Sequence, residues 1–236
     1  KYEAKKYVAE RIGEEYIIPT LGVWNHFDEI DFNALPDQFV LKCTHDSGGL
    51  VICTDKSKFD REVARKKIEH SLKRNFYWFG REWPYKNVPA RIIAEKYMSE
   101  DKNDTESTFN EINGGLRDYK LYCFDGKVKL YLVTTDRSKG ATTGDYFDEQ
   151  NRHLDLIWGF PNAKTIPDVP NNIEKMKELA EILAAGIPQL RVDFYCIHDK
   201  VYFGELTFFD GSGFDEIEQE CYRNLLGDYI KLPTLV

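Results

Sequence analysis

This sequence of 236 residues has no long apolar run: no window approaches the ~18 uninterrupted apolar residues that a membrane-spanning helix needs. It also has no excess of basic residues, because 40 acidic side chains outnumber 32 basic ones and the net charge is −8. Non-specific binding to nucleic acid requires a basic face. We therefore expect no nucleic-acid partner, although a small anionic ligand could bind in a local basic pocket.

Paired cysteine motifs are missing as well. The five cysteines are scattered and never form C-x-x-C (Cys43, Cys53, Cys123, Cys196 and Cys221). This pattern is typical of free thiols in a reducing compartment, and it argues against a disulfide framework or a zinc site. We therefore predict a cytoplasmic protein. His45 lies near Cys43, but two candidate ligands at one strand end do not make a tetrahedral metal site.

Apolar periodicity predicts both helices and paired strands. Helical spacing is found in the first twelve residues and after Asn172. Asp125-Gly126 is a strong signal for a two-residue hairpin turn. The predicted strands are 38–43, 49–53, 91–97, 118–124, 127–134, 190–196 and 201–208, with a polar loop over 99–115 and irregular structure over 135–170. Strand pairs mixed with helices predict an α+β fold.

The last predicted hairpin carries the strongest chemical signal. Alternation places Arg191 and Asp193 on one face of its first strand. With a three-residue turn over 198–200, Asp193 lies opposite Glu205. Arg191 then lies opposite Thr207. Facing carboxylates destabilise a hairpin unless a cation joins them, and Mg²⁺ is typically held by one or two carboxylates plus nucleotide phosphates. The alternative is an ion pair of Glu205 with Arg191 on a solvent face.

A second signal is a lysine before a glycine loop. Lys42 lies inside an apolar strand, where a buried lysine needs an anionic partner. The loop that follows contains Ser47, Gly48 and Gly49, and glycines let backbone N–H groups approach a phosphate closely. The loop lacks the G-K-[ST] of a Walker A motif, and an ordinary turn is the alternative. For Lys120, a phosphate contact and a solvated strand lysine are equally open, and the basic helix residues Lys73 and Arg74 indicate a solvated face.

The order of these parts resembles the ATP-grasp superfamily, and more closely the TupA-like ATP-grasp family linked to bacterial teichuronopeptide and surface-polysaccharide synthesis. The stretches that carry the resemblance are PDQFVLKCTHDSGG, GREWPYKN, RIIAEKYM, DYKLYCFDGK, RVDFY and YFGELTFFDGSGF. The resemblance implies an ATP-grasp fold, in which two α+β lobes with antiparallel sheets sandwich the nucleotide. It divides the chain into an N-terminal helix and linker (1–36), a small nucleotide-clamping lobe (about 37–98) and a larger lobe with the metal and catalytic residues (99–236).

The same resemblance implies roles for individual residues. The ATP-binding residues would be Lys5, Lys42, Ser47, Gly48 and Gly49 at the phosphates, with Glu95, Lys96, Tyr97 and Met98 as the hinge beside adenine. Asp193, Glu205 and Thr207 would hold Mg²⁺, and Thr207 stands where most ATP-grasp enzymes have the stronger ligand Asn. Arg191 and Lys120 would be the catalytic residues. Asp210 stands where we expect proline.

The function implied by the resemblance is that of an ATP-dependent carboxylate–amine ligase working through an acylphosphate, with ATP and Mg²⁺ as cofactors. Its substrates would be an amine or amino acid and a saccharide carboxylate of the uronic-acid type, in the bacterial cytoplasm. A homodimer is left open, and part of the acceptor site is expected upstream of Lys1 or on another subunit. One alternative is a sugar kinase with Asp118 or Asp210 as base. The other is a glycosyltransferase or sugar-binding protein, suggested by four aromatic residues (Trp78, Trp83, Tyr85 and Trp158).

Overall fold

The computed structural model describes residues 1–99, 116–135 and 142–232. The predicted loop over 99–115 therefore lies almost entirely outside the described residues. The chain divides into two compact units, one made of Lys1–Lys5 and Ile18–Met98 and the other of Lys6–Ile17 and Ser99–Val236. No helix of the described part is long and apolar enough to cross a membrane.

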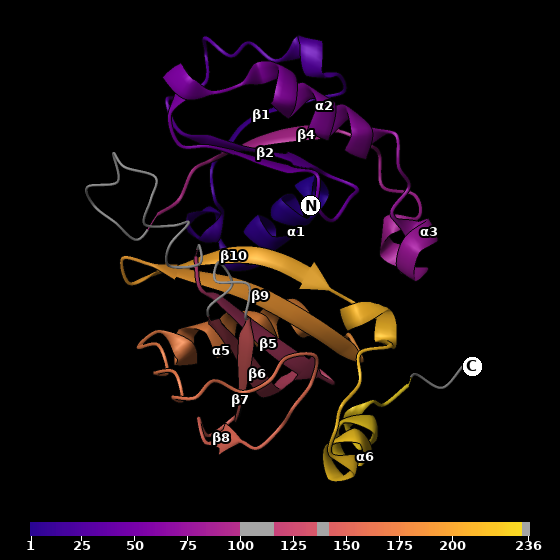
Figure 1. Cartoon of the computed structure of the whole chain (residues 1–236). Coiled ribbons are helices and arrows are strands. Elements are labelled where there is room, and N and C mark those ends of the chain that lie inside the picture. Colours follow the sequence, from indigo (N-terminus) through magenta and orange to yellow (C-terminus); the bar gives the residue numbers. More distant parts are fainter. Residues whose placement is uncertain (100–115, 136–141, 233–236) are drawn as a thin grey trace. The chain divides into compact units, whose positions relative to one another are not determined.

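Both units combine α-helices with an antiparallel sheet, as in an α+β fold (Figure 1). The α-helices are α1 (Tyr2–Ile12), α2 (Arg61–Leu72), α3 (Tyr77–Gly80), α5 (Ile173–Ala184) and α6 (Glu220–Tyr229). The strands are β1 (Thr20–Trp24), β2 (Phe39–Cys43), β3 (Leu50–Cys53), β4 (Ile92–Lys96), β5 (Asp118–Phe124), β6 (Lys127–Thr135), β7 (Thr143–Asp148), β8 (His153–Leu154), β9 (Gln189–Ile197) and β10 (Lys200–Thr207). Short 3-10 helices include η1 (Glu14–Tyr16), η2 (Phe27–Glu29), η3 (Lys56–Lys58), η4 (Trp83–Tyr85) and η6 (Asp210–Gly213).

The first unit is a four-stranded antiparallel sheet in the order β1-β4-β2-β3, with α2 packed against β2 and β3. Alternation in β2 buries Phe39 and Leu41 against Ile68 of α2. The helix begins where the Asp60 side chain accepts hydrogen bonds from the first free amides of α2. Strands predicted over 38–43, 49–53 and 91–97 are confirmed as β2, β3 and β4, whereas β1 lies in a segment predicted as linker.

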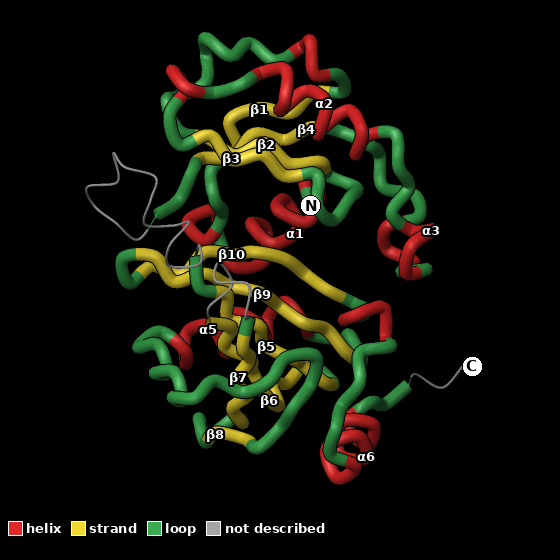
Figure 2. Tube along the Cα trace, viewed as in Figure 1, coloured by secondary structure: helices red, strands yellow, loops and turns green. Residues whose placement is uncertain are grey.

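The second unit is a six-stranded antiparallel sheet in the order β10-β9-β5-β6-β7-β8. Figure 2 shows α5 along one face, where it packs against β5, β6 and β9. Leu121 and Val192 point to that face and join Met176 of α5 in a buried cluster. The opposite face carries a second cluster that includes Tyr122 and, from α6, Leu226. Polar side chains of β5 and β9 share this second face.

The turn of the β5–β6 hairpin agrees with the prediction, and the turn of the β9–β10 hairpin does not. Asp125 and Gly126 both have positive φ, and they join β5 to β6 as predicted. The turn between β9 and β10 has only two residues, His198 and Asp199, both with positive φ. The predicted three-residue turn is therefore wrong.

The pairing predicted from that turn nevertheless holds, because the ladder shifts by one residue between Phe203 and Glu205. The extra residue, Gly204, forms a β-bulge, and Asp193 faces Glu205 beyond it. A Cβ on Gly204 would lie 3.1 Å from the Asp193 carbonyl oxygen, so the close approach favours glycine.

Strand β7 lies in the stretch predicted as irregular, so that prediction is wrong for these residues. Gly144, Asp145 and Asp148 weaken its local strand propensity. Five of its six residues are buried, however, and β7 pairs with β6 over its whole length. Tertiary burial therefore decides the conformation of this segment.

Candidate functional site

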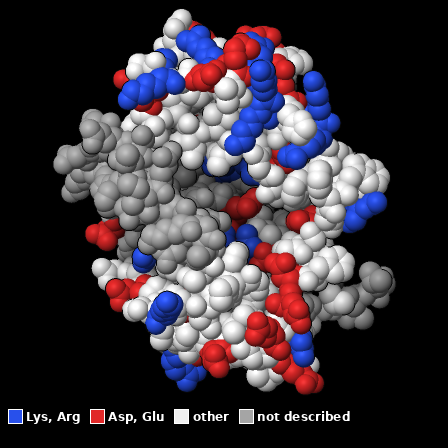
Figure 3. Space-filling view, viewed as in Figure 1, with Lys and Arg blue, Asp and Glu red and all other residues white. Residues whose placement is uncertain are grey.

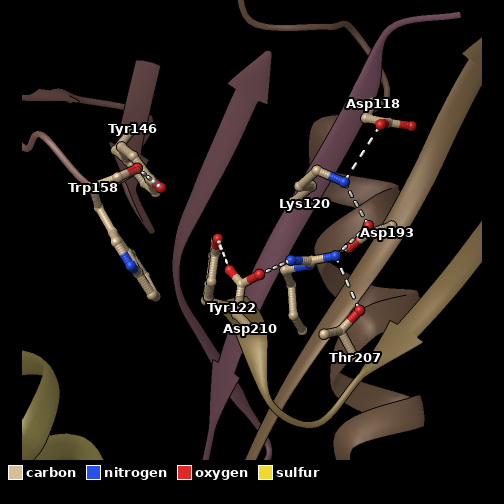
Figure 4. Close-up of polar contacts among 9 residues, drawn as sticks. Asp118, Lys120, Tyr122, Tyr146, Trp158, Asp193, Thr207 and Asp210 are labelled. Carbon is tan, nitrogen blue, oxygen red and sulfur yellow. Dashed lines mark hydrogen bonds and ion pairs between the residues drawn. The ribbon is translucent and has the colours of Figure 1, made fainter. Parts of the chain in front are cut away.

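Asp193 is the centre of a buried cluster of charges in the second unit (Figure 4). Its side chain accepts hydrogen bonds from Arg191, with Nε–Oδ1 at 2.7 Å and Nη2–Oδ2 at 2.9 Å, and from Lys120, with Nζ–Oδ2 at 2.7 Å. Arg191 and Asp193 are two positions apart on β9, and Lys120 faces Asp193 across the β5–β9 ladder. The alternation of two strands thus brings together the two predicted catalytic residues and a predicted metal ligand. Asp193 is only 4% exposed.

Arg191 is held by two further groups. Its guanidinium donates to Asp210 and, over 3.0 Å, to the Thr207 hydroxyl. Burial alone would lower the pKa of Arg191, but Asp193 and Asp210 outweigh it and raise the pKa above its ordinary value. The guanidinium therefore stays protonated.

Tyr122 completes the polar network on the same face of the sheet. Its hydroxyl donates to Asp210 Oδ2 over 2.6 Å, as Figure 4 shows. Burial raises the pKa of Tyr122 well above its ordinary value, so the hydroxyl keeps the proton that it donates. The sequence analysis did not single out Tyr122, and the one available signal was that it shares a face of the predicted strand with Lys120.

The predicted metal ligands are neighbours on β9 and β10: Asp193 faces Glu205, and Thr207 faces Arg191. Hard oxygen donors of this kind suit Mg²⁺. The cluster holds four carboxylates, with Asp118 3.4 Å from Lys120, against two cations, a local excess of negative charge that fits a divalent cation. Within the described residues no group of three or more His, Cys, Asp or Glu side chains is arranged to hold a metal. The two carboxylates and the hydroxyl do not form a complete protein site, but they fit a Mg²⁺ ion that is also held by nucleotide phosphates. Mg²⁺ binding stays a prediction.

In the first unit, Glu95 joins the two lysines predicted to contact phosphates. Lys42 Nζ lies 2.6 Å from Glu95 Oε2, and Lys5 bonds the other carboxylate oxygen. The anionic partner predicted for Lys42 is thus Glu95, which is 7% exposed. Burial alone would raise the pKa of Glu95, but Lys42 and Lys5 outweigh it and lower the pKa. Burial also lowers the pKa of Lys5 despite the attraction of Glu95.

The other predicted hinge residues lie at and after the end of β4. Lys96 is exposed, and its backbone N–H donates to the Pro19 carbonyl over 2.9 Å. Tyr97 and Met98 follow the strand and are half-buried. Their predicted contact with adenine stays a prediction.

The glycine loop between β2 and β3 is anchored to the end of α2. Asp46, which is 1% exposed, accepts hydrogen bonds from Ser71 and, over 2.7 Å, from Arg74. His45 Nε2 lies 3.2 Å and 3.0 Å from the carbonyl oxygens of the same two residues, near the C-terminal end of the helix. His45 thus contacts one carbonyl oxygen in the last turn of α2 and one just beyond the end of the helix. The prediction of a solvated face is wrong for Arg74, whose guanidinium is tied to the loop.

The predicted phosphate-loop residues differ in exposure. Ser47 and Gly48 are exposed, and Gly48 has a φ of +116° that favours glycine. Gly49 is buried, and a Cβ there would lie 2.5 Å from Ser71 Oγ. The tip of the loop is therefore exposed, and phosphate contacts of Ser47, Gly48 and Gly49 stay a prediction.

The four aromatic residues of the sugar-binding alternative fall into two groups. Trp158 packs against Tyr122 and Tyr146, with ring centroids 4.8 Å and 5.9 Å away, so it belongs to the second cluster of the second unit. Trp78 and Trp83 are largely exposed, and Tyr85 beside them in the chain is half-buried. On the face in Figure 3, basic and acidic side chains are interspersed among the residues drawn in colour.

Comparisons with known proteins give one family match. A family model described as TupA-like ATPgrasp matches residues 1–231. No curated protein matches the chain significantly.

Three solved structures illustrate the structural similarity. D-alanine–D-alanine ligase from Helicobacter pylori is 16% identical, with a TM-score of 0.48 over 90% of this chain and 54% of that chain. D-alanine–D-alanine ligase from Bacillus anthracis complexed with ATP is 15% identical, with a TM-score of 0.46 over 87% and 53%. ATP-grasp ligase PsnB complexed with minimal precursor is 9% identical, with a TM-score of 0.43 over 86% and 49%. The chain spans about half the length of these proteins, and similarities of this size carry no argument about its site.

Proposed function

Because the chain belongs to the TupA-like ATP-grasp family, we propose that it is an ATP-dependent ligase that joins a carboxylate to an amine. The observation that carries this proposal is the buried cluster of Lys120, Arg191 and Asp193, with Glu205 opposite Asp193. Phosphoryl transfer depends mainly on positioning and on electrostatic stabilisation. A site composed of cations and carboxylates suits such chemistry.

The proposed reaction has two steps. A substrate carboxylate oxygen attacks the γ-phosphorus of ATP, the bond to the β-phosphate oxygen breaks, and an acylphosphate and ADP result. The amine nitrogen then attacks the acyl carbon, the amine loses a proton, and inorganic phosphate leaves as the amide forms. Arg191 and Lys120 would counter the negative charge on the transferring phosphoryl group and on the oxyanion of the second step.

Asp193 and Glu205, with the Thr207 hydroxyl, would hold Mg²⁺, which neutralises nucleotide phosphate charge when bound. In the first unit, Lys42 and Lys5 would contact phosphates, and Ser47 and Gly48 would offer backbone amides at the loop tip. The remaining hinge residues, Lys96, Tyr97 and Met98, would contact the base.

For the substrates we propose a saccharide carboxylate of the uronic-acid type and an amino acid or other amine, used in bacterial surface polysaccharide biosynthesis in the cytoplasm. The five cysteines are all free, which supports a reducing compartment. The proposal that the carboxylate substrate is a saccharide is supported by the family resemblance.

Ligase chemistry is favoured over the sugar kinase by the surroundings of Asp210. A kinase would need a base that can accept the proton of a sugar hydroxyl. Both carboxylate oxygens of Asp210 already accept hydrogen bonds, one from Tyr122 and one from Arg191. The other candidate base, Asp118, is already engaged in an ion pair with Lys120 at 3.4 Å.

Thermal unfolding with ADP and Mg²⁺ tests the nucleotide site. Ligand at ~100 times its dissociation constant adds about 2.7 kcal/mol, or roughly 5–10 °C for a chain of this size. The Mg²⁺-dependent part of the shift should disappear in Glu205→Gln and persist in Glu216→Gln, the same change at an exposed position. Glu205 is the better test position, because neutralising Asp193 would leave two buried cations without their shared partner.

Hydroxylamine then tests the reaction, because this amine converts any acylphosphate to a hydroxamate. Incubation with MgATP, galacturonate and hydroxylamine should give ADP, phosphate and a hydroxamate in equal amounts. A phosphorylated sugar without hydroxamate would show the kinase instead. A folded protein with no nucleotide-dependent shift would overturn the proposal as a whole.

A further inference from the structure

One short segment of the first unit exposes large aromatic side chains. It contains α3 and η4 (residues 76–86; α3 is labelled in Figure 1). Trp78 is 61% exposed, Phe79 65% and Trp83 60%. Single exposed apolar residues are ordinary, whereas three large exposed ones within six residues are a concentration of apolar surface that calls for a binding partner.

The patch is organised by contacts among its own rings. Tyr77 is half-buried and meets the rings of Trp78 and Trp83 edge-on, with centroids 5.2 Å and 6.3 Å away. Phe76 stacks on Phe79 at 5.6 Å. The exposed indoles are thus held by neighbouring rings, and little conformational entropy is lost when a ligand packs on them.

Two positive charges accompany the exposed rings. Residues 76–86 contain two basic side chains and one acidic one, in a chain whose net charge is −8. The Arg81 guanidinium lies 4.5 Å from the Trp78 centroid, and Lys86 Nζ lies 4.2 Å from that of Trp83. Among the described residues, neither Arg81 nor Lys86 forms an ion pair with a carboxylate. Both charges are therefore available to an external anion beside an aromatic surface.

We propose that residues 76–86 form a binding site for an acidic saccharide. An indole ring offers an apolar surface to the C–H face of a pyranose. The planar guanidinium of Arg81 matches the two oxygens of a carboxylate, and Lys86 adds a second positive charge. The ligand class follows from this combination, because a neutral sugar would leave the two cations unused and a small inorganic anion would leave the indoles unused.

Two other anionic partners fit the segment less well. A membrane surface is typically bound by a long amphipathic helix with one apolar face, whereas α3 has four residues and charged Arg81 and Glu82 interrupt the aromatic run. A nucleic acid requires a broad basic face, and this segment offers only two basic side chains beside the acidic Glu82. The site is separate from the proposed ligase chemistry and does not depend on it.

Binding of oligogalacturonide to the full chain, measured by titration calorimetry and by tryptophan fluorescence, tests the proposal. Trp78→Ala and Trp83→Ala should each weaken binding about tenfold or more. Phe214→Ala removes a ring that is 87% exposed in the second unit, and this control should bind like the wild type. Arg81→Gln should lower affinity for the acidic oligosaccharide and leave the weak affinity for a neutral maltooligosaccharide unchanged. The altered side chains are largely exposed, so the variants should fold.

Three results would overturn the proposal. One is equal affinity for the acidic and the neutral oligosaccharide. Another is binding to phosphatidylglycerol vesicles without binding to oligogalacturonide, which would show a membrane surface. The third is a calorimetric stoichiometry for oligogalacturonide that the double change Trp78→Ala and Trp83→Ala does not reduce, because only saccharide bound at the proposed ligase site should survive that change. The ADP shift, measured on the same preparations, reports separately on the nucleotide site.

Discussion

Tyr122 and Asp210 lie 88 residues apart in the chain, and the Tyr122 hydroxyl donates a hydrogen bond of 2.6 Å to Asp210 Oδ2. Asp210 also accepts a hydrogen bond from Arg191. The Tyr122 hydroxyl therefore helps to position the buried guanidinium through Asp210. The relationship connects the packed aromatic cluster of the second unit to its charged cluster.

Removing this hydroxyl should destabilise the protein measurably. Tyr122→Phe leaves one oxygen of Asp210 without its buried donor, and such a loss costs about 1–3 kcal/mol. Urea unfolding of wild type and variant measures the difference. Tyr229→Phe is the control, because that hydroxyl forms no hydrogen bond in the described part of the chain and its loss should change stability little. Equal stability of Tyr122→Phe and wild type would show that the contact contributes nothing.

Lys42 should contribute to nucleotide affinity through its charge. Lys42→Met keeps the apolar stem of the side chain but removes the ammonium group. Loss of a charged hydrogen bond costs about 1.5–3 kcal/mol, so we expect ADP to bind roughly 10- to 150-fold more weakly. Titration calorimetry with ADP and Mg²⁺ measures this. Lys66→Met makes the same change at an exposed position of α2 and should leave affinity unchanged. An unchanged affinity in Lys42→Met would remove Lys42 from the phosphate site.

Glu95 makes stability depend on pH in the acid range. Its pKa in the folded protein lies below the ordinary value of 4.5 because Lys42 and Lys5 outweigh its burial. The carboxylate therefore stabilises the fold above about pH 4.5, and this contribution is lost as the pH falls through the lowered pKa. Glu95→Gln should cost about 3–5 kcal/mol near neutral pH, as expected for breaking a buried ion pair.

The difference between wild type and Glu95→Gln should shrink as the pH falls below 4.5. Urea unfolding at intervals from pH 3 to 7 follows it. A difference in unfolding free energy that stays constant over this range would mean that the charge of Glu95, and its pairing with Lys42 and Lys5, does not stabilise the fold.

Asp46 should order the glycine loop. Asp46→Asn removes the buried charge that pairs with Arg74 and accepts from Ser71, so we expect a loss of about 1–3 kcal/mol and faster hydrogen exchange at the amides of residues 44–49. Asp28→Asn breaks an exposed pair with Arg65 and should change neither quantity appreciably. Unchanged exchange in Asp46→Asn would show that the loop holds its conformation without this anchor.

Much of the fold could be predicted because its signals are local. Alternation in β2, β5 and β9 and the helical spacing of α5 identified the buried faces, and Asp125-Gly126 identified a turn. The predicted opposition of Asp193 and Glu205 is correct, but through a two-residue turn and a bulge at Gly204. A bulge depends on the local approach of two strands, and the sequence pattern of one strand does not reveal it.

The sequence by itself determined the residue types of the candidate site and the strand faces that carry them, because side-chain alternation is a local property of a strand. Only the tertiary structure decided which of these residues meet. Lys5 and Glu95 are 90 positions apart, and Lys120 and Asp193 are 73 apart. Arg74, expected in solvent, is tied to Asp46 in the loop. No local propensity links such residues, and they meet because a charged group that is buried when the sheets pack needs partners of opposite charge.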